Sequence, residues 1–154
     1  MKLSTRARYA LRMMVEIARH TNGSKKVSLN QVAKGTHISR RYLEQLAIAL
    51  KNSDLITGVT GKGGGYMLAK PADKIKVGEI VEASIGPINI VDCVMQPEMC
   101  MLTDFCVCRP IYQRINDRIT DILDEFSLAD LASMKPKKNT SRSKNTTNSS
   151  CPSR

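Results

Sequence analysis

Two short helical patterns joined by a tight corner constrain the fold of this chain more than any other feature. Ser28 can cap a helix over residues 29–34 that Gly35 is placed to end. Residues 36–38 form the turn, and Ser39 can cap the next helix. The apolar residues of that helix share one face and are expected to pack inward: Leu43, Leu46, Ala47 and Leu50. Helix, turn and helix in this order is the helix-turn-helix pattern.

An amphipathic helix precedes this corner and a hairpin follows it. Ser4 or Thr5 can cap the first helix, whose apolar stripe runs from Ala10 to Ala18 and which ends near residues 22–23. Two short β-prone runs, residues 55–59 and 66–69, are joined by the glycine-rich residues 60–65, which predicts a hairpin. We therefore expect a mainly α-helical fold with a small β-hairpin wing, a winged helix-turn-helix.

Charge is divided unevenly along the 154 residues. Residues 1–70 carry 13 Lys and Arg against 3 Asp and Glu, a net charge of +10. Residues 71–134 carry 5 against 11, a net charge of −6, and residues 135–154 carry 6 against none, a net charge of +6. A basic front half beside an acidic back half predicts a nucleic-acid interface confined to one module. A generally solvated basic face is the alternative.

The polar face of the helix after Ser39 carries side chains suited to base edges. Arg can bind guanine, Gln can bind adenine, and Glu can accept from the cytosine amino group. The expected DNA-binding residues also include the two helix caps and the wing, and the full set is Ser28, Ser39, Arg40, Arg41, Glu44, Gln45, Thr60 and Lys62. The alternative for each of them is an ordinary solvated side chain. The expected partner is double-stranded DNA.

Four cysteines follow within sixteen residues, and their spacing is Cys93-x6-Cys100-x5-Cys106-x-Cys108. This spacing matches neither the C-x2-C zinc ribbons nor the bacterial ferredoxin pattern. The cysteines stand among Asp92, Glu98 and Asp104 rather than in an apolar stripe, so small buried thiols are a poor explanation. Soft sulfur ligands in one loop favour iron–sulfur clusters, and zinc is the second choice.

Several segments together resemble the IscR and NsrR family of winged-helix, iron–sulfur-binding transcription regulators. They are the opening residues 1–10, residues 42–46 of the second helix of the corner, the wing residues 63–66, and residues 76–80. The resemblance covers about residues 1–132 and implies that the positions of Glu44 and Gln45 face DNA. Two positions depart from the family, where a wing Arg is replaced by Thr60 and a recognition-helix Ser by Arg41. We therefore expect a different preferred operator.

The same resemblance implies that Cys93, Cys100 and Cys106 ligate iron. The interval between Cys93 and Cys100 is one residue longer than the matching interval in the family. A [2Fe–2S] cluster is expected, with a [4Fe–4S] cluster as the alternative. The family's histidine ligand is replaced by Arg109 and the N-terminal aspartate ligand of some members by Arg8. Cys108 is the local candidate for the fourth ligand, and an outside or small-molecule ligand competes with it. Some relatives in the wider family bind no cluster.

A nearly heptad apolar seam occupies residues 110–126, where Ile111, Ile115, Ile119, Ile122 and Phe126 recur. It predicts a long helix that pairs two subunits on a palindromic operator, or alternatively one that packs on its own core. Ser127 can cap a short last helix. The expected organisation is a DNA-binding domain over residues 1–85, a cluster-binding loop over 86–109, a dimerisation helix and short helix over 110–134, and a disordered basic tail over 135–154 that includes Cys151.

These patterns predict a homodimeric DNA-binding regulator, a repressor by expectation, whose operator binding responds to iron, oxygen, nitric oxide or redox status. The alternatives are a cluster-free thiol-, zinc- or metabolite-responsive repressor and a small iron–sulfur electron-transfer or carrier protein. No nucleophile–base pair or paired carboxylates form a plausible site, so an enzyme is not expected. No apolar run reaches the ~20 residues of a membrane span, and no signal peptide is evident, so a cytoplasmic protein is expected.

Overall fold

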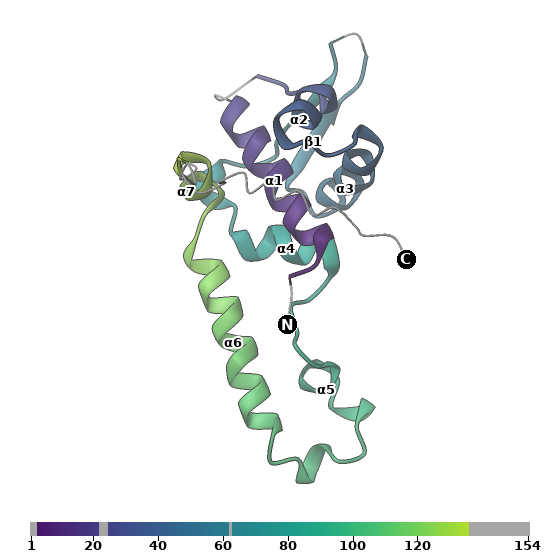
Figure 1. The fold of residues 1–154 in the computed structure, drawn as a ribbon, viewed down its shortest axis with the longest axis vertical. Coiled ribbons are helices and arrows are strands. Elements are labelled where there is room, and N and C mark those ends of the chain that lie inside the picture. Colours follow the sequence, from purple (N-terminus) through teal and green to yellow (C-terminus); the bar gives the residue numbers. More distant parts are fainter. Residues whose placement is uncertain (1–2, 22–24, 62, 136–154) are drawn as a thin grey trace, which may run out of the picture.

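The computed structural model describes residues 3–21, 25–61 and 63–135, and it divides into a head and an arm (Figure 1). The head comprises the described residues of 3–85 and 127–135, and the arm comprises residues 86–126. Lys62, Cys151 and nearly all of the predicted basic tail therefore lie outside the described residues. Within the described part, no helix is both long enough and apolar enough to cross a bilayer.

The first three helices, the hairpin, the long helix and the short last helix follow one another as the sequence patterns predict. The head contains α1 (Thr5–His20), α2 (Leu29–Thr36), α3 (Arg40–Asn52), β1 (Ile56–Val59), β2 (Gly65–Leu68), the 3-10 helix η1 (Ala72–Lys74), α4 (Val77–Ile85) and α7 (Leu128–Ser133). The arm contains α5 (Asp92–Met95), the 3-10 helices η2 (Pro97–Met99) and η3 (Thr103–Phe105), and α6 (Arg109–Glu125). The predicted fold class, mainly helical with a hairpin wing, is confirmed.

The core of the head forms where α1, α3 and α4 meet. α1 begins at its cap, where the Ser4 hydroxyl accepts a hydrogen bond from the amide of Ala7, and its buried stripe includes Met13, Met14 and Ile17. α4 packs against both α1 and α3 and contributes the fully buried Ile80. Burial of such side chains contributes about 1.5–3 kcal/mol each, so the helices hold one another in place.

The end of α2 differs from its prediction. Gly35 was expected to end the helix, but α2 continues to Thr36, and His37 takes the left-handed conformation at φ 56°. A Cβ atom at Gly35 would overlap the carboxyl group of Glu16 in α1, which is the far end of a flexible side chain. A substitution here would therefore displace the Glu16 carboxyl group from its place between α1 and α2.

The wing is an antiparallel hairpin in which Ile56 pairs with Leu68 and Val59 pairs with Gly65. An isolated bridge joins Val27, in the segment between α1 and α2, to Tyr66. Past β2, the Lys70 ammonium bonds the Glu79 carboxylate of α4 at 2.5 Å. Burial raises the pKa of Glu79, but bonds from Lys70 and the Lys76 amide outweigh it and leave the pKa lowered. The wing is thus tied to the head at its base.

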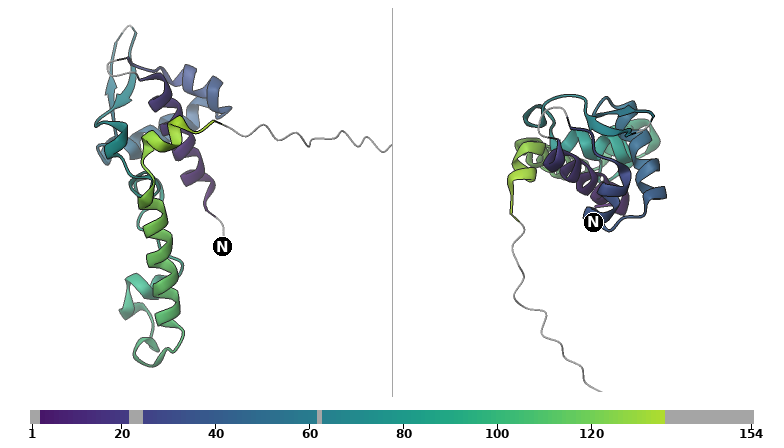
Figure 2. Two further views of the ribbon diagram at one scale, coloured as in Figure 1. Left: turned by 90° about the vertical axis from the view of Figure 1, so that its left-hand side faces the viewer. Right: turned by 90° about the horizontal axis from the view of Figure 1, so that it is seen from above.

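The arm leaves the head after α4 and returns along α6 (Figure 2). α6 packs against α4 near the head and against α5 toward the far end. The chain re-enters the head where the Val77 amide donates to the carbonyl of Phe126 and the Leu128 amide donates to that of Ile75. Ser127 and Asp130 form the capping box of α7, and bonds from Ser127 lower the pKa of Asp130. The predicted last helix is confirmed, and it packs on α1 in the head.

Candidate nucleic-acid interface and cysteine loop

The turn between α2 and α3 sets the position of the predicted recognition helix. The Ser28 hydroxyl accepts from the amide of Gln31, and the Ser39 hydroxyl accepts from the amide of Tyr42. His37 allows the sharp corner between them through its left-handed backbone. The predicted inward face of α3 is buried as a whole, and it consists of Leu43, Leu46, Ala47 and Leu50. Both predicted DNA-contacting serines are therefore helix caps in this structure.

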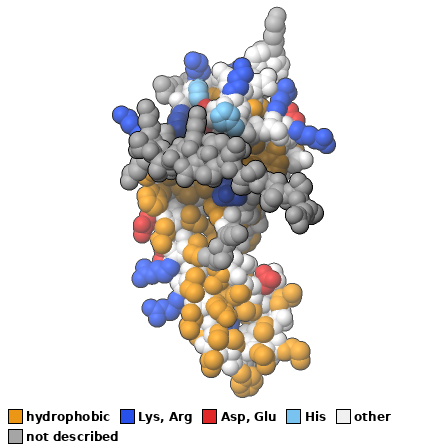
Figure 3. Space-filling view, viewed as in Figure 1, with side chains coloured by type: hydrophobic (Ala, Val, Ile, Leu, Met, Phe, Trp, Pro, Cys, Tyr) orange, Lys and Arg blue, Asp and Glu red, His pale blue; other side chains and the backbone are white. Residues whose placement is uncertain are grey.

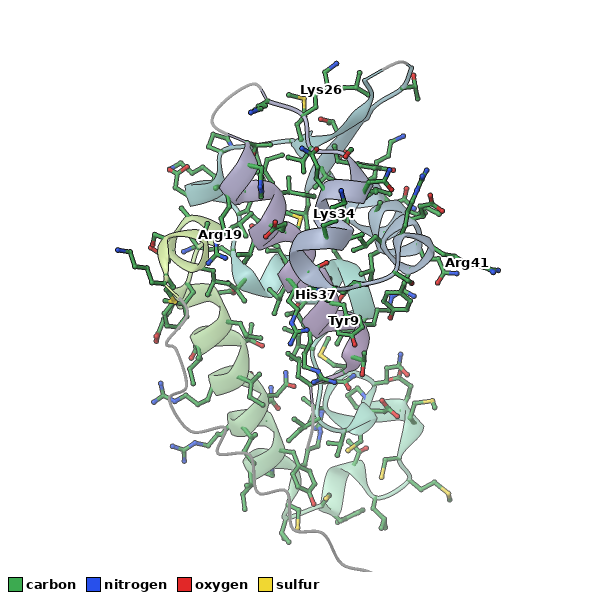
Figure 4. The ribbon with its side chains drawn as sticks, turned by 45° about the horizontal axis from the view of Figure 1, so that its top comes forward. Tyr9, Arg19, Lys26, Lys34, His37 and Arg41 are labelled. Atoms are coloured by element: carbon green, nitrogen blue, oxygen red, sulfur yellow. The ribbon has the colours of Figure 1, made fainter. Side chains whose placement is uncertain are left out.

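The opposite face of α3 presents polar side chains to solvent. Arg40 Nε lies 3.0 Å from Glu44 Oε1, and both side chains are about half exposed. Arg41 and Gln45 are exposed beside this pair, and Figure 4 shows Arg41 pointing outward from the head. An exposed pair of this kind contributes about 0.2–1 kcal/mol, so a DNA ligand can displace it. Four of the predicted base-reading residues thus share one accessible face.

The head carries further basic side chains outside α3. Lys25, Lys26 and Lys34 are exposed on the head, and Figure 3 shows Lys and Arg side chains gathered there. Thr60 is exposed at the start of the wing turn, while Lys62 falls outside the described residues. The head therefore carries the positive surface that duplex phosphates require.

An aromatic contact between α1 and α3 was missed by the sequence reasoning. The Tyr9 and Tyr42 rings meet edge to face, with centroids 5.7 Å apart, and the Arg12 guanidinium lies 5.6 Å from the Tyr9 centroid. Such aromatic pairs contribute about 0.5–1.5 kcal/mol beyond burial and fix helix orientation. Composition was the one sequence signal for this contact. The chain has only four Tyr and two Phe, and two of the Tyr lie in these helices.

The cysteine loop lies in the arm, away from the reading face. Cys93 sits in α5, Cys100 follows η2, Cys106 follows η3, and Cys108 caps α6. The expectation that Cys106 and Cys108 precede regular helix is confirmed, whereas Cys93 lies within a helical turn. All four are free thiols, and Cys108 is exposed whereas the other three are partly buried.

The thiols suit a soft metal or cluster by chemistry, but the structure does not bring them together into a site. Among the described residues, no group of three or more His, Cys, Asp or Glu side chains is arranged to hold a metal ion. Hydrogen bonds from side chains to the backbone hold the loop. Arg109 Nε donates to the carbonyl of Cys93 at 3.3 Å, and Thr103 Oγ1 donates to that of Cys100 at 2.8 Å. Arg109 therefore links the start of α6 to α5.

The outer surface of the arm is strongly apolar. Met99, Met101, Phe105 and Val107 are all more than two-thirds exposed, and Met101 is fully exposed. The predicted seam of α6 continues this surface, because Ile111 is 59% exposed and a groove of about 430 Å³ runs along it. Figure 3 shows this concentration of hydrophobic side chains over the arm. Exposed apolar surface of this extent is typical of a protein–protein interface.

Known proteins share this architecture. The chain matches the Rrf2 family, described as iron-dependent transcriptional regulators, over residues 3–134. It is 34% identical over 135 residues to the regulator IscR of Pectobacterium atrosepticum, covering 88% of this chain and 81% of the relative. The solved structure of T. potens IscR aligns with a TM-score of 0.69 at 30% identity, covering 88% of this chain and 93% of that one.

A second solved structure is similar to the same degree. It is CymR, the global cysteine regulator of B. subtilis, which aligns with a TM-score of 0.70 at 35% identity. The alignment covers 86% of this chain and 97% of that one. The family match spans the head, the cysteine loop and α6. Both IscR of Pectobacterium atrosepticum and CymR of Bacillus subtilis are named as HTH-type transcriptional regulators. The chain belongs to the Rrf2 family of transcriptional regulators.

Proposed function

We propose that this chain is a homodimeric, DNA-binding regulator whose affinity for a palindromic operator responds to an iron–sulfur cluster held in the arm. Residues 1–85 bind DNA, residues 86–109 hold the cluster, and α6 pairs the subunits. The observation that carries the proposal is the division of the chain into a basic head with an exposed recognition face and an arm with four free thiols. Membership of a family described as iron-dependent supports it.

On the reading face, Arg41 and Arg40 have different roles. Arg40 is held by Glu44 in the free protein, so it and Glu44 are available to bases or phosphates only after this pair opens. Arg41 projects freely near the N-terminus of α3, the part of a recognition helix that contacts base edges most. We therefore assign Arg41 to a guanine and Gln45 to an adenine. Ser28, Ser39, Thr60 and Lys62 complete the contact surface toward the phosphates.

Replacing Arg41 by alanine is expected to weaken binding to the preferred operator roughly 5- to 150-fold, because a bidentate contact to guanine contributes about 1–3 kcal/mol. Preference at a single base pair should relax at the same time. Fluorescence anisotropy on a duplex selected from a random pool, and on its single-base variants, measures both effects. Arg41→Lys is the matched control, because it keeps the charge without the planar fork. Equal base preference in all three proteins would contradict the assignment.

The arm supplies the donor set for the cluster. Cys93, Cys100 and Cys106 are the proposed ligands, Cys108 is the proposed fourth, and a [2Fe–2S] cluster is preferred over [4Fe–4S]. Such a cluster, when bound, supplies iron that reacts with oxygen, nitric oxide or electrons. The chain's part is to gather the thiols, because no three of them are arranged to hold a metal ion among the described residues. The bond from Arg109 to the carbonyl of Cys93 already ties α5 to the start of α6.

Rearrangement of the loop can reach the reading face through α6 and α4. Arg109 connects α5 to α6, α6 packs on α4, and α4 packs on both α1 and α3. Gathering the thiols would change the Arg109 contact with Cys93 and thereby the position of α6. A difference of this kind between two states is expected to couple the sites by about 1–3 kcal/mol, or roughly 5- to 150-fold in operator affinity.

Anaerobic purification followed by a visible spectrum and iron and sulfide analysis tests the cluster. The unaltered protein should contain iron with matching sulfide, and Cys100→Ala should lose both together with the response of operator binding to cluster loss. Cys151→Ala, outside the arm, is the matched control and should behave as the unaltered protein. Loss of the cluster in Cys108→Ala would identify the fourth ligand. Unchanged iron content in Cys100→Ala would refute the proposed site.

A cluster-free, thiol-responsive regulator is the second candidate, and one observation favours it. The four thiols are free and separate in the structure, and the similar CymR is named as a cysteine regulator. In this case the anaerobic protein would be colourless and free of iron, yet its operator binding would still change when the thiols of the arm are oxidised. Zinc held by the same cysteines would show as bound zinc without sulfide.

A further inference from the structure

A groove between α1 and α2 lies on the head and is not used by the function proposed above. Its volume is about 370 Å³, within the range of roughly 300–1,000 Å³ that is typical of small-molecule sites. It presents a carboxylate, two guanidinium groups and two aliphatic side chains to one small volume. These two helices pack against each other and supply the lining, which includes Leu11, Arg12, Val15, Glu16, Arg19 and Gly35.

The charged groups of the groove are not joined to one another. Arg12 lies one helical turn before Glu16 and Arg19 lies one turn after it, spacings at which Arg and Glu side chains commonly pair. Among the described residues, however, neither arginine forms an ion pair with Glu16. The Arg12 guanidinium lies 5.6 Å from the centroid of the Tyr9 ring, and the Arg19 guanidinium donates to two backbone carbonyls near the end of α7. The Glu16 carboxylate and the Arg12 guanidinium are therefore both available to a ligand.

The carboxyl group of Glu16 is the part of the groove that gains most from a ligand. Its side chain is only 16% exposed, and a buried charge is unfavourable unless it is paired and hydrogen-bonded. His20 Nδ1 lies 3.6 Å from Glu16 Oε1, but the same nitrogen lies 2.9 Å from the backbone carbonyl of Glu16, so a proton on it is bonded to the backbone. On the α2 side the carboxyl group lies against Gly35. A ligand ammonium group would give this carboxylate a charged donor.

The signs of the charges select the class of ligand. A simple cation would be repelled by Arg12 and Arg19, and a simple anion would be repelled by Glu16. A zwitterion meets neither penalty, because its ammonium group can bind Glu16 while its carboxylate binds the Arg12 guanidinium through paired hydrogen bonds. Leu11 and Val15 are partly buried and offer an apolar surface to the rest of the ligand. This combination fits an α-amino acid with an apolar side chain.

We propose that the groove binds a free α-amino acid with an apolar side chain and that its occupancy strengthens operator binding. Thr36 also lines the groove, and it is the last residue of α2 before the corner at His37. A ligand that joins α1 to α2 therefore holds the corner from which α3 begins at Arg40. The effect on operator binding rests on the proposed DNA binding of the head, whereas binding of the amino acid does not.

Isothermal titration calorimetry of the full-length protein with L-alanine, L-valine, L-leucine and L-methionine measures ligand binding without DNA. At least one of these amino acids should bind with a Kd below about 1 mM. Its affinity should fall at least roughly tenfold in Glu16→Gln and in Arg12→Gln, because each variant removes a charged hydrogen-bond partner. Gly35→Ala should weaken binding as well, because its Cβ atom displaces the Glu16 carboxyl group. Glu82→Gln, at an exposed position of α4 outside the groove, is the matched control and should bind as the unaltered protein does.

Two analogues of the amino acid that binds test the need for both charges. Its amide has no carboxylate and its deaminated acid has no ammonium group, so each should bind at least roughly tenfold more weakly. Equal affinity for either analogue would overturn the assignment of a zwitterion. Absence of binding by all four amino acids, or unchanged affinity in all three groove variants, would overturn the site itself.

Fluorescence anisotropy with a selected operator measures the effect on DNA binding. At a saturating concentration of the amino acid, operator affinity should rise roughly fivefold or more in the unaltered protein. Unchanged operator affinity beside measured ligand binding would overturn the regulatory role. Failure of the proposed function differs from this result, because the protein would then show no preference for the operator with or without the amino acid.

Discussion

Replacing Ile115 by glutamate is expected to convert the protein to a monomer and weaken operator binding about 100-fold or more. Ile115 is 41% exposed in the middle of the α6 groove, between Ile111 and Ile119, and a paired helix would cover it. A symmetric interface contains each residue twice, so the substitution buries two charges in one dimer. Losing about 2 kcal/mol at each copy weakens association by about 4 kcal/mol, or roughly 1,000-fold.

Sedimentation velocity reports the oligomeric state, and anisotropy with a full palindrome and with a half-site reports the consequence for DNA. Gln113→Glu is the matched control, because it adds the same charge at an exposed position of α6 outside the groove. The control should remain a dimer with unchanged affinity. A dimeric Ile115→Glu protein would show that α6 does not pair the subunits.

Replacing Leu46 by alanine is expected to lower the free energy of unfolding by about 3 kcal/mol, within the 2–5 kcal/mol range for buried leucines. Leu46 is 1% exposed and belongs to the buried cluster that includes Met13 and Ile80. Its truncation would therefore leave a cavity inside the core. The midpoint of thermal unfolding should fall by roughly 10 °C for a chain of this size.

Ile48→Ala tests whether the cost of Leu46→Ala comes from burial. Ile48 lies two residues further along the same helix and is 63% exposed. Its replacement should change the free energy of unfolding by no more than about 0.5 kcal/mol. Urea or thermal unfolding followed by circular dichroism separates the two variants. Equal losses of unfolding free energy in both variants would show that Leu46 does not lie on the buried face of α3.

Periodicity and capping made most of the head predictable from sequence. The apolar stripe of α3 and its Ser39 cap were found because burial and caps act within a few residues of one another. The hairpin followed from a glycine-rich turn between two β-prone runs. The prediction that Gly35 ends α2 was wrong, because α2 continues to Thr36 and His37 takes the left-handed conformation that a glycine usually supplies.

The arm was less predictable, for a physical reason. Its cysteines were found by spacing, but the short turns of α5, η2 and η3 have neither long apolar periodicity nor strong caps. Sequence could not show that Arg109 bonds the carbonyl of Cys93, since the two residues lie sixteen positions apart. The Tyr9–Tyr42 contact escaped for the same reason: it depends on how two helices cross.

The buried apolar cluster of the head has an evolutionary consequence. Among the described residues, it includes Ile80 of α4 and Leu128 of α7 and uses no side chain of the arm. A change in the number or order of cysteines in residues 93–108 therefore removes no side chain from this cluster, and it acts on the head only through the packing of α6 on α4. Selection can exchange one chemical stimulus for another on this scaffold while the DNA sequence it recognises, and so its set of controlled promoters, is inherited unchanged.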